Sequence, residues 1–239
     1  MGALNCVSSK TARISTPIIL VNFKTYLEAT GEKSFELAKI AEEVARETGI
    51  CIIVAPQTTD IRRIVGGVDI PVFAQHMDPV GAGAYTGHVT AEAIKEAGAS
   101  GTLLNHSERR LKLSEIDSAI ERAKATGLTS VVCANTAQVS AASSALKPNM
   151  VAIEPPELIG TGIAVSKAKP EIITNTVSFI RQIDREIIIL CGAGITKGED
   201  VSSALKLGTQ GVLVASGVVK AKDRRSALLD LVRAALEKA

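Results

Sequence analysis

The sequence predicts an α/β fold, and within that class a (β/α)8 barrel of eight parallel strands with surrounding helices. From residue 17 onward, short apolar runs of strand length alternate with longer stretches of helical period, and the alternation repeats eight times. Most of the short runs are apolar throughout, as strands buried on both faces must be. The expected strands are 18–22, 50–55, 72–75, 101–105, 130–134, 150–154, 187–191 and 211–215.

The segments between these runs have the spacing of amphipathic crossover helices. Leu37, Ala41 and Val44 fall on one helical face, as do Ile116, Ile120 and their neighbours in the next long segment. Parallel strands joined by helices fit either an open doubly wound sheet or a closed barrel. The barrel is preferred because it explains the polar residues that follow several of the strands.

Length and composition are those of one globular catalytic domain with a short extension. The 239 residues are 46% hydrophobic, which is enough to bury a substantial core. Residues 1–16 are polar and basic without acids, and are expected to be a flexible N-terminal extension; a weak organelle-targeting signal is the alternative. The barrel is expected to span 17–239.

Charge, aromatic content and cysteine spacing limit the partners. The 27 Lys and Arg against 25 Asp and Glu leave a net charge of +2, and only 3% of residues are aromatic, so nucleic acid is not an expected partner. No apolar run approaches the roughly 20 residues of a membrane span. The four cysteines lie far apart with no Cys-x-x-Cys pair, which favours reduced thiols and a cytoplasmic location.

Polar residues follow the carboxyl ends of strands 1, 4 and 6, which a barrel brings to one face, where such barrels carry their chemistry. Asn22 and Lys24 are two residues apart, so an extended backbone projects both side chains to the same side. A solvated loop lysine is the alternative for Lys24. Glu154 closes an apolar run before a proline, where a charge is expensive unless it is used; the alternative is a capping or paired carboxylate.

His106 is expected to be a neutral hydrogen-bond donor. Ser107 is a possible N-cap for a helix over 108–113, whose positive end would disfavour protonation of the imidazole. A structural histidine is the alternative. His76 and His88, assigned to the long turn around 77–87, are not expected to act directly.

Two further segments suggest a lid and a phosphate site. Residues 155–162 have two prolines, an apolar tip and a Gly-Thr-Gly exit, the composition of a hinged lid. Gly192-Ala193-Gly194 and Ala215-Ser216-Gly217 follow strands 7 and 8, where barrels often bind phosphate through backbone N–H groups. The alternative for either turn is that its glycines serve only the backbone geometry of the turn.

These motifs, in this order and spacing, resemble those of the triosephosphate isomerase family, in its compact archaeal type, over essentially the whole chain after the extension. Asn22-Phe23-Lys24 is similar to the family's Asn-x-Lys, His106 through Arg110 to its electrophile motif, and Glu154 through Gly162 to its base and flexible loop. Two departures stand out. The lid reads Pro155-Pro156-Glu157 in place of an aromatic-bearing Pro-Val-Trp, and 192–194 reads Gly-Ala-Gly in place of Gly-Gly-Ser, which removes one hydroxyl.

The resemblance implies a TIM barrel that interconverts dihydroxyacetone phosphate and D-glyceraldehyde 3-phosphate through an enediol or enediolate, in glycolysis and gluconeogenesis, without a metal or other cofactor. It implies Glu154 as the base, His106 as the electrophile, Lys24 as the electrostatic partner and Asn22 as a residue that places the substrate. Glu108 is expected to support this group. The implied substrate and phosphate contacts are Asn22, Lys24, Ile159, Gly160, Gly194, Ala215 and Ser216.

The resemblance also implies self-association. The barrel is shorter than the roughly 250 residues typical of the fold, which leaves apolar surface to cover. Residues 77–87 resemble the family's interlocking dimer loop, and a homotetramer is expected in preference to a homodimer. Two other functions stay open at this point: another phosphate-binding barrel isomerase, such as one of amino-acid biosynthesis, and a barrel that binds a phosphometabolite without catalysis.

Overall fold

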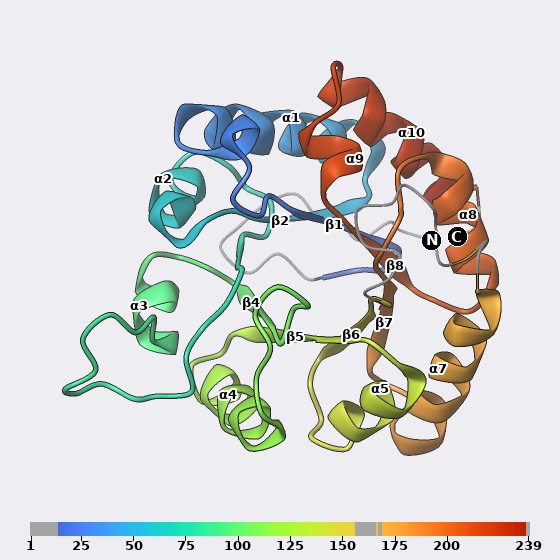
Figure 1. The fold of residues 1–239 in the computed structure, drawn as a ribbon. Coiled ribbons are helices and arrows are strands. Elements are labelled where there is room, and N and C mark those ends of the chain that lie inside the picture. The colour runs from blue at the N-terminus through green and yellow to red at the C-terminus, as the bar shows by residue number, and fades with distance from the viewer. Residues whose placement is uncertain (1–13, 156–165, 167–168, 238–239) are drawn as a thin grey trace.

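The structure is a computed structural model that describes residues 14–155, 166 and 169–237 (Figure 1). Its centre is one eight-stranded parallel sheet with the strand order β2-β1-β8-β7-β6-β5-β4-β3. The strands are β1 (Ile18–Asn22), β2 (Cys51–Ala55), β3 (Phe73–Ala74), β4 (Gly101–Leu104), β5 (Thr129–Ala134), β6 (Met150–Ile153), β7 (Ile188–Cys191) and β8 (Gly211–Val214). The predicted fold class and all eight strands are confirmed.

The barrel closes at a weak seam between β2 and β3. An isolated bridge pairs Val54 with Val72, and the Val54 N–H donates to the Pro71 carbonyl at 3.1 Å. With only two residues, β3 is shorter than the predicted 72–75. Strand β2 therefore meets β3 through few hydrogen bonds.

Helices surround the strands, as Figure 1 shows. The helices are η1 (Leu27–Ala29), α1 (Glu32–Thr48), η2 (Thr58–Asp60), α2 (Ile61–Val65), α3 (Ala91–Glu96), α4 (Leu113–Ala125), α5 (Ala137–Ser144), α7 (Pro170–Ile183), α8 (Gly198–Lys206), α9 (Ser216–Val219) and α10 (Arg224–Leu236). Among the described residues, no helix has the length and apolar character needed to cross a bilayer.

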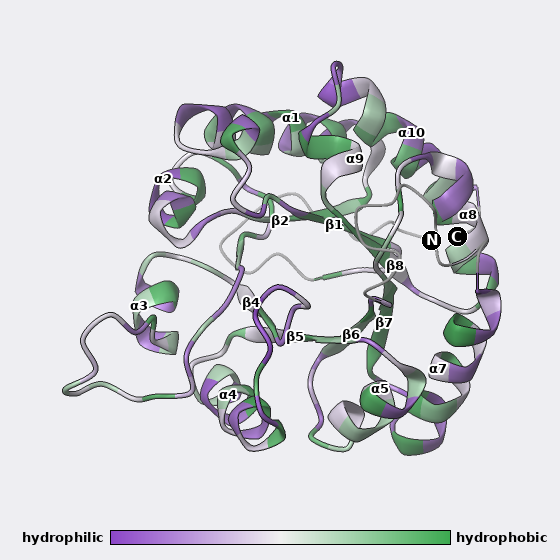
Figure 2. Ribbon diagram, viewed as in Figure 1, coloured by the Kyte–Doolittle hydropathy of each residue, from purple (hydrophilic) through white to green (hydrophobic). Residues whose placement is uncertain are grey.

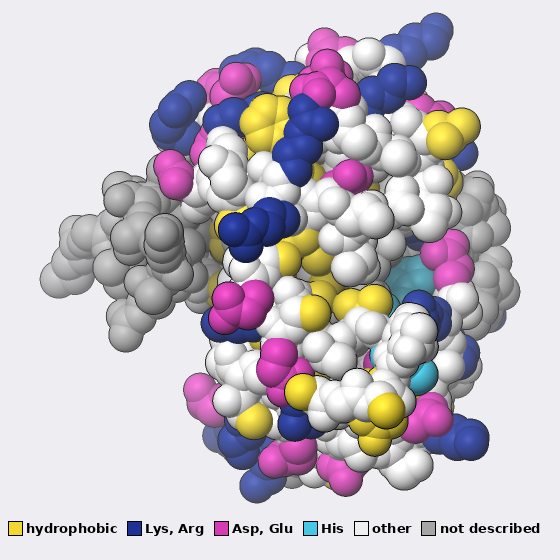
Figure 3. All heavy atoms as spheres, turned by 90° about the vertical axis from the view of Figure 1, so that its left-hand side faces the viewer, with side chains coloured by type: hydrophobic (Ala, Val, Ile, Leu, Met, Phe, Trp, Pro, Cys, Tyr) yellow, Lys and Arg dark blue, Asp and Glu magenta, His cyan; other side chains and the backbone are white. Residues whose placement is uncertain are grey.

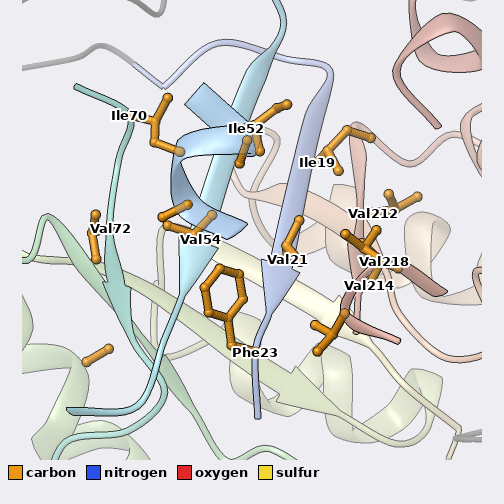
Figure 4. Packing of buried hydrophobic residues seen from close by; sticks show 14 of the residues in the cluster. Ile19, Val21, Phe23, Ile52, Val54, Ile70, Val72, Val212, Val214 and Val218 are labelled. Carbon is orange, nitrogen blue, oxygen red and sulfur yellow. The ribbon is translucent and has the colours of Figure 1, made fainter. Parts of the chain in front are cut away.

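The two-residue period of each strand divides the core into two layers. Ile18 and Leu20 of β1 point into the barrel, where they meet inward residues of the other strands such as Phe73. Ile19 and Val21 point outward and pack with side chains from β2, β8 and the helices, as Figure 4 shows. Figure 2 shows strands that are largely hydrophobic and helices with hydrophilic residues on their outer sides. This alternation also decides which residues at the strand ends face the barrel mouth.

The segment 77–87 between β3 and α3 contains no helix or strand and projects from the barrel (Figure 1). Its base is fixed by Asp78, whose carboxylate accepts the Val89 N–H at 2.7 Å and lies 3.1 Å from His76 Nε2. Figure 3 looks onto this side of the molecule, where Lys and Arg side chains are interspersed with Asp and Glu. The projecting segment is therefore anchored at its base and exposed at its tip.

Burial of the inner layer predicts a large stability loss on truncation. Leu20 is fully buried, so Leu20→Ala is expected to lower the free energy of unfolding by about 2–5 kcal/mol through lost burial and the cavity left behind. The matched control is Leu113→Ala, where the side chain is 53% exposed and the expected change is within about 0.5 kcal/mol. Urea denaturation of the two variants at one protein concentration measures both changes. Equal losses would contradict the assignment of Leu20 to the core.

Candidate active site

The carboxyl ends of β1, β4, β6, β7 and β8 surround one pocket. It is lined by Asn22, Lys24, His106 and Glu154 together with residues 193–196 and 213–216. These are the same strand ends at which the sequence shows polar or glycine-rich turns. The structure thus brings together every predicted site residue that lies among the residues it describes, with Glu108 next to the pocket.

Glu154 points into the barrel mouth because it continues the inward alternation of Met150 and Ala152. Its N–H donates to the Ala134 carbonyl at 2.7 Å, and the side chain is buried, with the residue only 3% exposed. Carboxylate Oε1 lies 3.5 Å from His106 Nε2. Within the described residues the other carboxylate oxygen, Oε2, is buried and has no hydrogen-bond partner.

The carboxylate is held in its ionised form by its neighbours. Burial raises the pKa of Glu154, but the His106 N–H, the Cys133 thiol and the Lys24 ammonium together bring that pKa below its usual value. Burial, followed by the charge of Glu154, raises the pKa of the Cys133 thiol, which therefore stays protonated and donates toward the carboxylate. At neutral pH the pocket holds a buried anion that is ready to act as a base.

Gly192 provides the space that Glu154 occupies. The two residues are neighbours on adjacent strands, one step beyond the pairing of Ile153 with Cys191. A Cβ atom on Gly192 would lie 2.5 Å from Glu154 Cγ and 2.8 Å from its Oε1. No side chain fits there without displacing the carboxylate, so Gly192 makes room for Glu154, a role that its place in a glycine-rich turn does not reveal.

The ring of His106 is oriented by a backbone hydrogen bond and not by the helix end that the sequence predicts. The predicted helix over 108–113 is wrong: residues 107–109 form a turn, and α4 begins only at Leu113. The Glu108 backbone N–H donates to His106 Nδ1 at 3.2 Å, so Nδ1 is an acceptor and the ring proton lies on Nε2. The Nε2–H therefore faces the pocket and Glu154 without any helix end nearby.

Asn105 fixes the backbone from which His106 projects. It is a non-glycine residue in the left-handed region, with φ 58°. Its side chain donates to the Cys133 carbonyl at 2.9 Å and accepts the Leu111 N–H at 2.9 Å. These two bonds join the end of β4 to β5 and to the following turn, which orients the imidazole.

Lys24 reaches the pocket from a left-handed backbone, with φ 49°, and not from the extended conformation that the spacing predicts. Asn22 accepts the Lys24 N–H through its side-chain oxygen at 2.9 Å. Lys24 Nζ lies 2.7 Å from Glu108 Oε1. Glu108 thereby contacts two site residues, Lys24 through its carboxylate and His106 through its N–H.

The turns after β7 and β8 also border the pocket. Ala193 and Gly194 are both left-handed, with φ 75° and 74°. The N-terminal turn of α9 starts at Ser216, and the first N–H groups of a helix have no partner within it. A Cβ on Gly217 would lie 2.9 Å from Thr196 Cα, so the glycine allows α9 to approach the turn after β7. Residues of both turns therefore line the same pocket.

Some predicted features fall elsewhere. His76 pairs with Asp78, and His88 packs edge-on against Tyr85 at 5.8 Å, so neither is part of the pocket. Ile159, Gly160 and all but the first residue of the predicted lid over 155–162 lie outside the described residues. Among the residues that are described, no group of three or more His, Cys, Asp and Glu side chains has the arrangement of a metal site.

Sequence reasoning missed Cys133 and the steric role of Gly192. Both continue the inward alternation of their strands, Cys133 after Val131 and Gly192 after Leu190. The two-residue alternation along each strand was the sequence signal that could have identified them. Inward residues in the last layer of a barrel border its mouth.

The comparisons with known proteins agree with this geometry. The family model for triosephosphate isomerase matches residues 17–235. A triosephosphate isomerase from Methanobacterium bryantii is 56% identical over 217 residues, covering 91% of this chain and 96% of the relative, and one from Methanocaldococcus jannaschii is 53% identical over 216 residues, covering 90% and 99%.

A solved structure shows the same fold at lower sequence identity. The crystal structure of triosephosphate isomerase from Bartonella henselae superposes with a TM-score of 0.73 at 21% identity, covering 92% of this chain and 100% of the other. This similarity supports the barrel alone. The family match and the archaeal relatives decide the family, and the chain belongs to the triosephosphate isomerase family.

Proposed function

We propose that Glu154, His106 and Lys24 carry out the isomerisation of triose phosphates in this chain, with Glu154 as the base. The activity of the family is the interconversion of dihydroxyacetone phosphate and D-glyceraldehyde 3-phosphate. One observation supports this assignment above the others: the buried carboxylate of Glu154 lies 3.5 Å from Nε2 of His106 in the same pocket.

The reaction moves a proton between adjacent carbons, so it needs a base and a donor to the carbonyl oxygen. Glu154 Oε2 takes the carbon proton, and an enediol or enediolate forms. The His106 Nε2–H stabilises the oxygen on which negative charge develops, and Lys24 adds positive potential at the same place. A carboxylate base paired with a neutral imidazole is already established for triosephosphate isomerases.

The phosphate group is proposed to lie against Gly194, Ala215 and Ser216. Backbone N–H groups at the start of α9 and in the turn after β7 suit an anion, since the N-terminal end of a helix carries partial positive charge. Gly194 has no hydroxyl to offer, so its contribution is made through the main chain. Asn22 and Lys24, which also line the pocket, are proposed to contact the rest of the substrate.

We also propose a cytoplasmic homotetramer that acts in glycolysis and gluconeogenesis. No disulfide joins the described cysteines Cys51, Cys133 and Cys191, which suits a reducing compartment. Exposed apolar side chains occur at Tyr85 in the projecting segment and at Phe179 and Ile183 of α7, which Figure 1 places on opposite sides of the barrel. Two separate apolar faces favour a tetramer, which needs two kinds of contact.

The base is tested by shortening its side chain. Glu154→Asp keeps the charge but retracts the carboxylate by one methylene, and a misplacement of about 1 Å can cost about 10²-fold in rate. We expect kcat to fall on the order of 10²- to 10³-fold while KM changes by less than about tenfold, because the phosphate contacts remain. Steady-state kinetics on the folded variant measure both constants. A kcat near that of the unaltered enzyme would show that Glu154 is not the base.

The space beside the base is tested by filling it. Gly192→Ala places a methyl group against Glu154 Cγ, so kcat is expected to fall by about 10²-fold with a smaller change in KM. Gly66→Ala is the matched control: its nearest neighbour would be a carbonyl oxygen at 3.4 Å and its φ is −69°, so activity should be unchanged. Full activity in Gly192→Ala would mean that the carboxylate is not confined as the structure shows.

Assembly is tested in solution. Light scattering on the purified protein at micromolar concentration is expected to give four times the 24.9 kDa mass of the chain. A dimer would leave the apolar face of α7 without the partner proposed for it. A monomer would refute self-association through either face.

A further inference from the structure

The Lys24 backbone is held in place at both of its ends, and one of the two holding residues has no role in the site described above. On the amino side, Asn22 Oδ1 accepts the Lys24 N–H at 2.9 Å. On the carboxyl side, Gln75 Nε2 donates to the Lys24 carbonyl at 2.8 Å. Gln75 does not line the pocket, so any effect that it has on the reaction must pass through another residue.

Gln75 comes directly after β3 at the seam where the barrel closes. The same Nε2 that contacts Lys24 also donates to the Ala55 carbonyl at 2.9 Å. Ala55 ends β2, and its carbonyl also accepts the Phe23 N–H at 3.0 Å. One side-chain amide thus links the ends of β1, β2 and β3, where the only bridge between β2 and β3 in the described chain is Val54 with Val72.

The identity of the amide atom follows from its partners. Both partners are backbone carbonyls, which accept hydrogen bonds and never donate them, so the atom between them must be the NH₂ group. Both hydrogens of this NH₂ group are donated, one to each carbonyl. A carboxylate at this position would face two carbonyl oxygens with no hydrogen to share, and a thioether would leave both carbonyls without this donor.

Lys24 needs such a restraint because its conformation is unfavourable for a residue with a side chain. With φ at 49°, it lies in the left-handed region, which non-glycine residues adopt only when their surroundings enforce it. The flexible stem of a lysine does not position its own ammonium group. The direction of the stem, and the 2.7 Å contact of Nζ with Glu108, therefore depend on this backbone conformation.

We propose that Gln75 is a positioning residue that holds the Lys24 backbone in its left-handed conformation and so places the ammonium group in the pocket. The inference rests on the proposed role of Lys24 in the reaction. It assigns Gln75 no contact with the substrate.

The test is a double-mutant cycle of kcat/KM for glyceraldehyde 3-phosphate with Gln75→Glu, Lys24→Met and the double variant. We expect Gln75→Glu to lower kcat/KM by about 10- to 100-fold, as a misplaced charge does. In the Lys24→Met background the same change should cost less than about twofold, because no ammonium is left to misplace. Gln75→Met, which is uncharged, should reproduce the loss and the non-additivity if the carboxylate variant folds poorly.

Gln57→Glu is the matched control. Its amide donates to a single partner, Thr30 Oγ1, on the exposed surface, so kcat/KM should not change. A crystal structure of Gln75→Met or Gln75→Glu should show Lys24 outside the left-handed region or Nζ displaced from Glu108.

Three outcomes would overturn the inference. The first is a fold-loss of kcat/KM on changing Gln75 that is as large in the Lys24→Met background as in the unaltered enzyme. This would mean that Gln75 acts independently of the ammonium group. The second is full activity in both Gln75 variants. The third is full activity in Lys24→Met itself, which would overturn the proposed role of Lys24 as well and is thereby distinguished from a failure of the Gln75 inference alone.

Discussion

One buried negative charge determines how the mouth of this barrel is built. Glu154 is 3% exposed, and an ionised carboxylate in such a place is costly unless neighbouring groups stabilise it. The stabilising groups are the His106 N–H, the Cys133 thiol and the Lys24 ammonium, which come from three different strands. Because each must approach a single carboxylate, the ends of β1, β4 and β5 have to be held in specific positions relative to β6. The remaining features of the mouth follow from this requirement.

Backbone strain is concentrated where those positions are set. The described chain has four non-glycine residues in the left-handed region, Lys24, Asn105, Lys147 and Ala193, and three of them follow strands that border the pocket. Each such conformation costs of order 1 kcal/mol or more and persists only when its surroundings enforce it. Asn105 is enforced by its own side-chain hydrogen bonds to β5 and to the turn after β4. The left-handed conformation of Lys24 is held by the side-chain amides of two other residues, Asn22 and Gln75.

The sequence predicts the barrel and the position of Glu154 well because both depend on periodicity. Eight apolar runs separated by helical segments define the strands, and a two-residue alternation carried through β6 directs Glu154 inward. Periodicity stops being informative where the backbone leaves the extended region. Lys24 is the example: its presence in the pocket was predicted, but the extended geometry used to predict it is wrong, since φ is 49°.

Tertiary contacts account for what the sequence could not show. The helix predicted beside His106 does not form, and the ring is oriented by the N–H of Glu108, a contact that depends on the tight turn after β4. Gln75 ends an expected strand in the same manner as Asn22 and Glu154, yet its importance is visible only when β1 and β2 lie beside it. A polar residue at a strand end thus indicates the site, and only packing shows whether it faces the substrate or another residue.

The turn after β7 shows how a departure from the usual family pattern is accommodated. Where the family pattern that the sequence resembles reads Gly-Gly-Ser, this chain has Gly192, Ala193 and Gly194. Gly192 has no freedom to vary, because Glu154 occupies the space of any side chain. Gly194, which carries no hydroxyl, adopts the left-handed conformation with φ 74° at no steric cost. Ala193 carries the strain of the same conformation at φ 75°, while its methyl group remains buried at 8% exposure. This turn has no hydroxyl to offer, so the anion contacts proposed for it are made by backbone N–H groups.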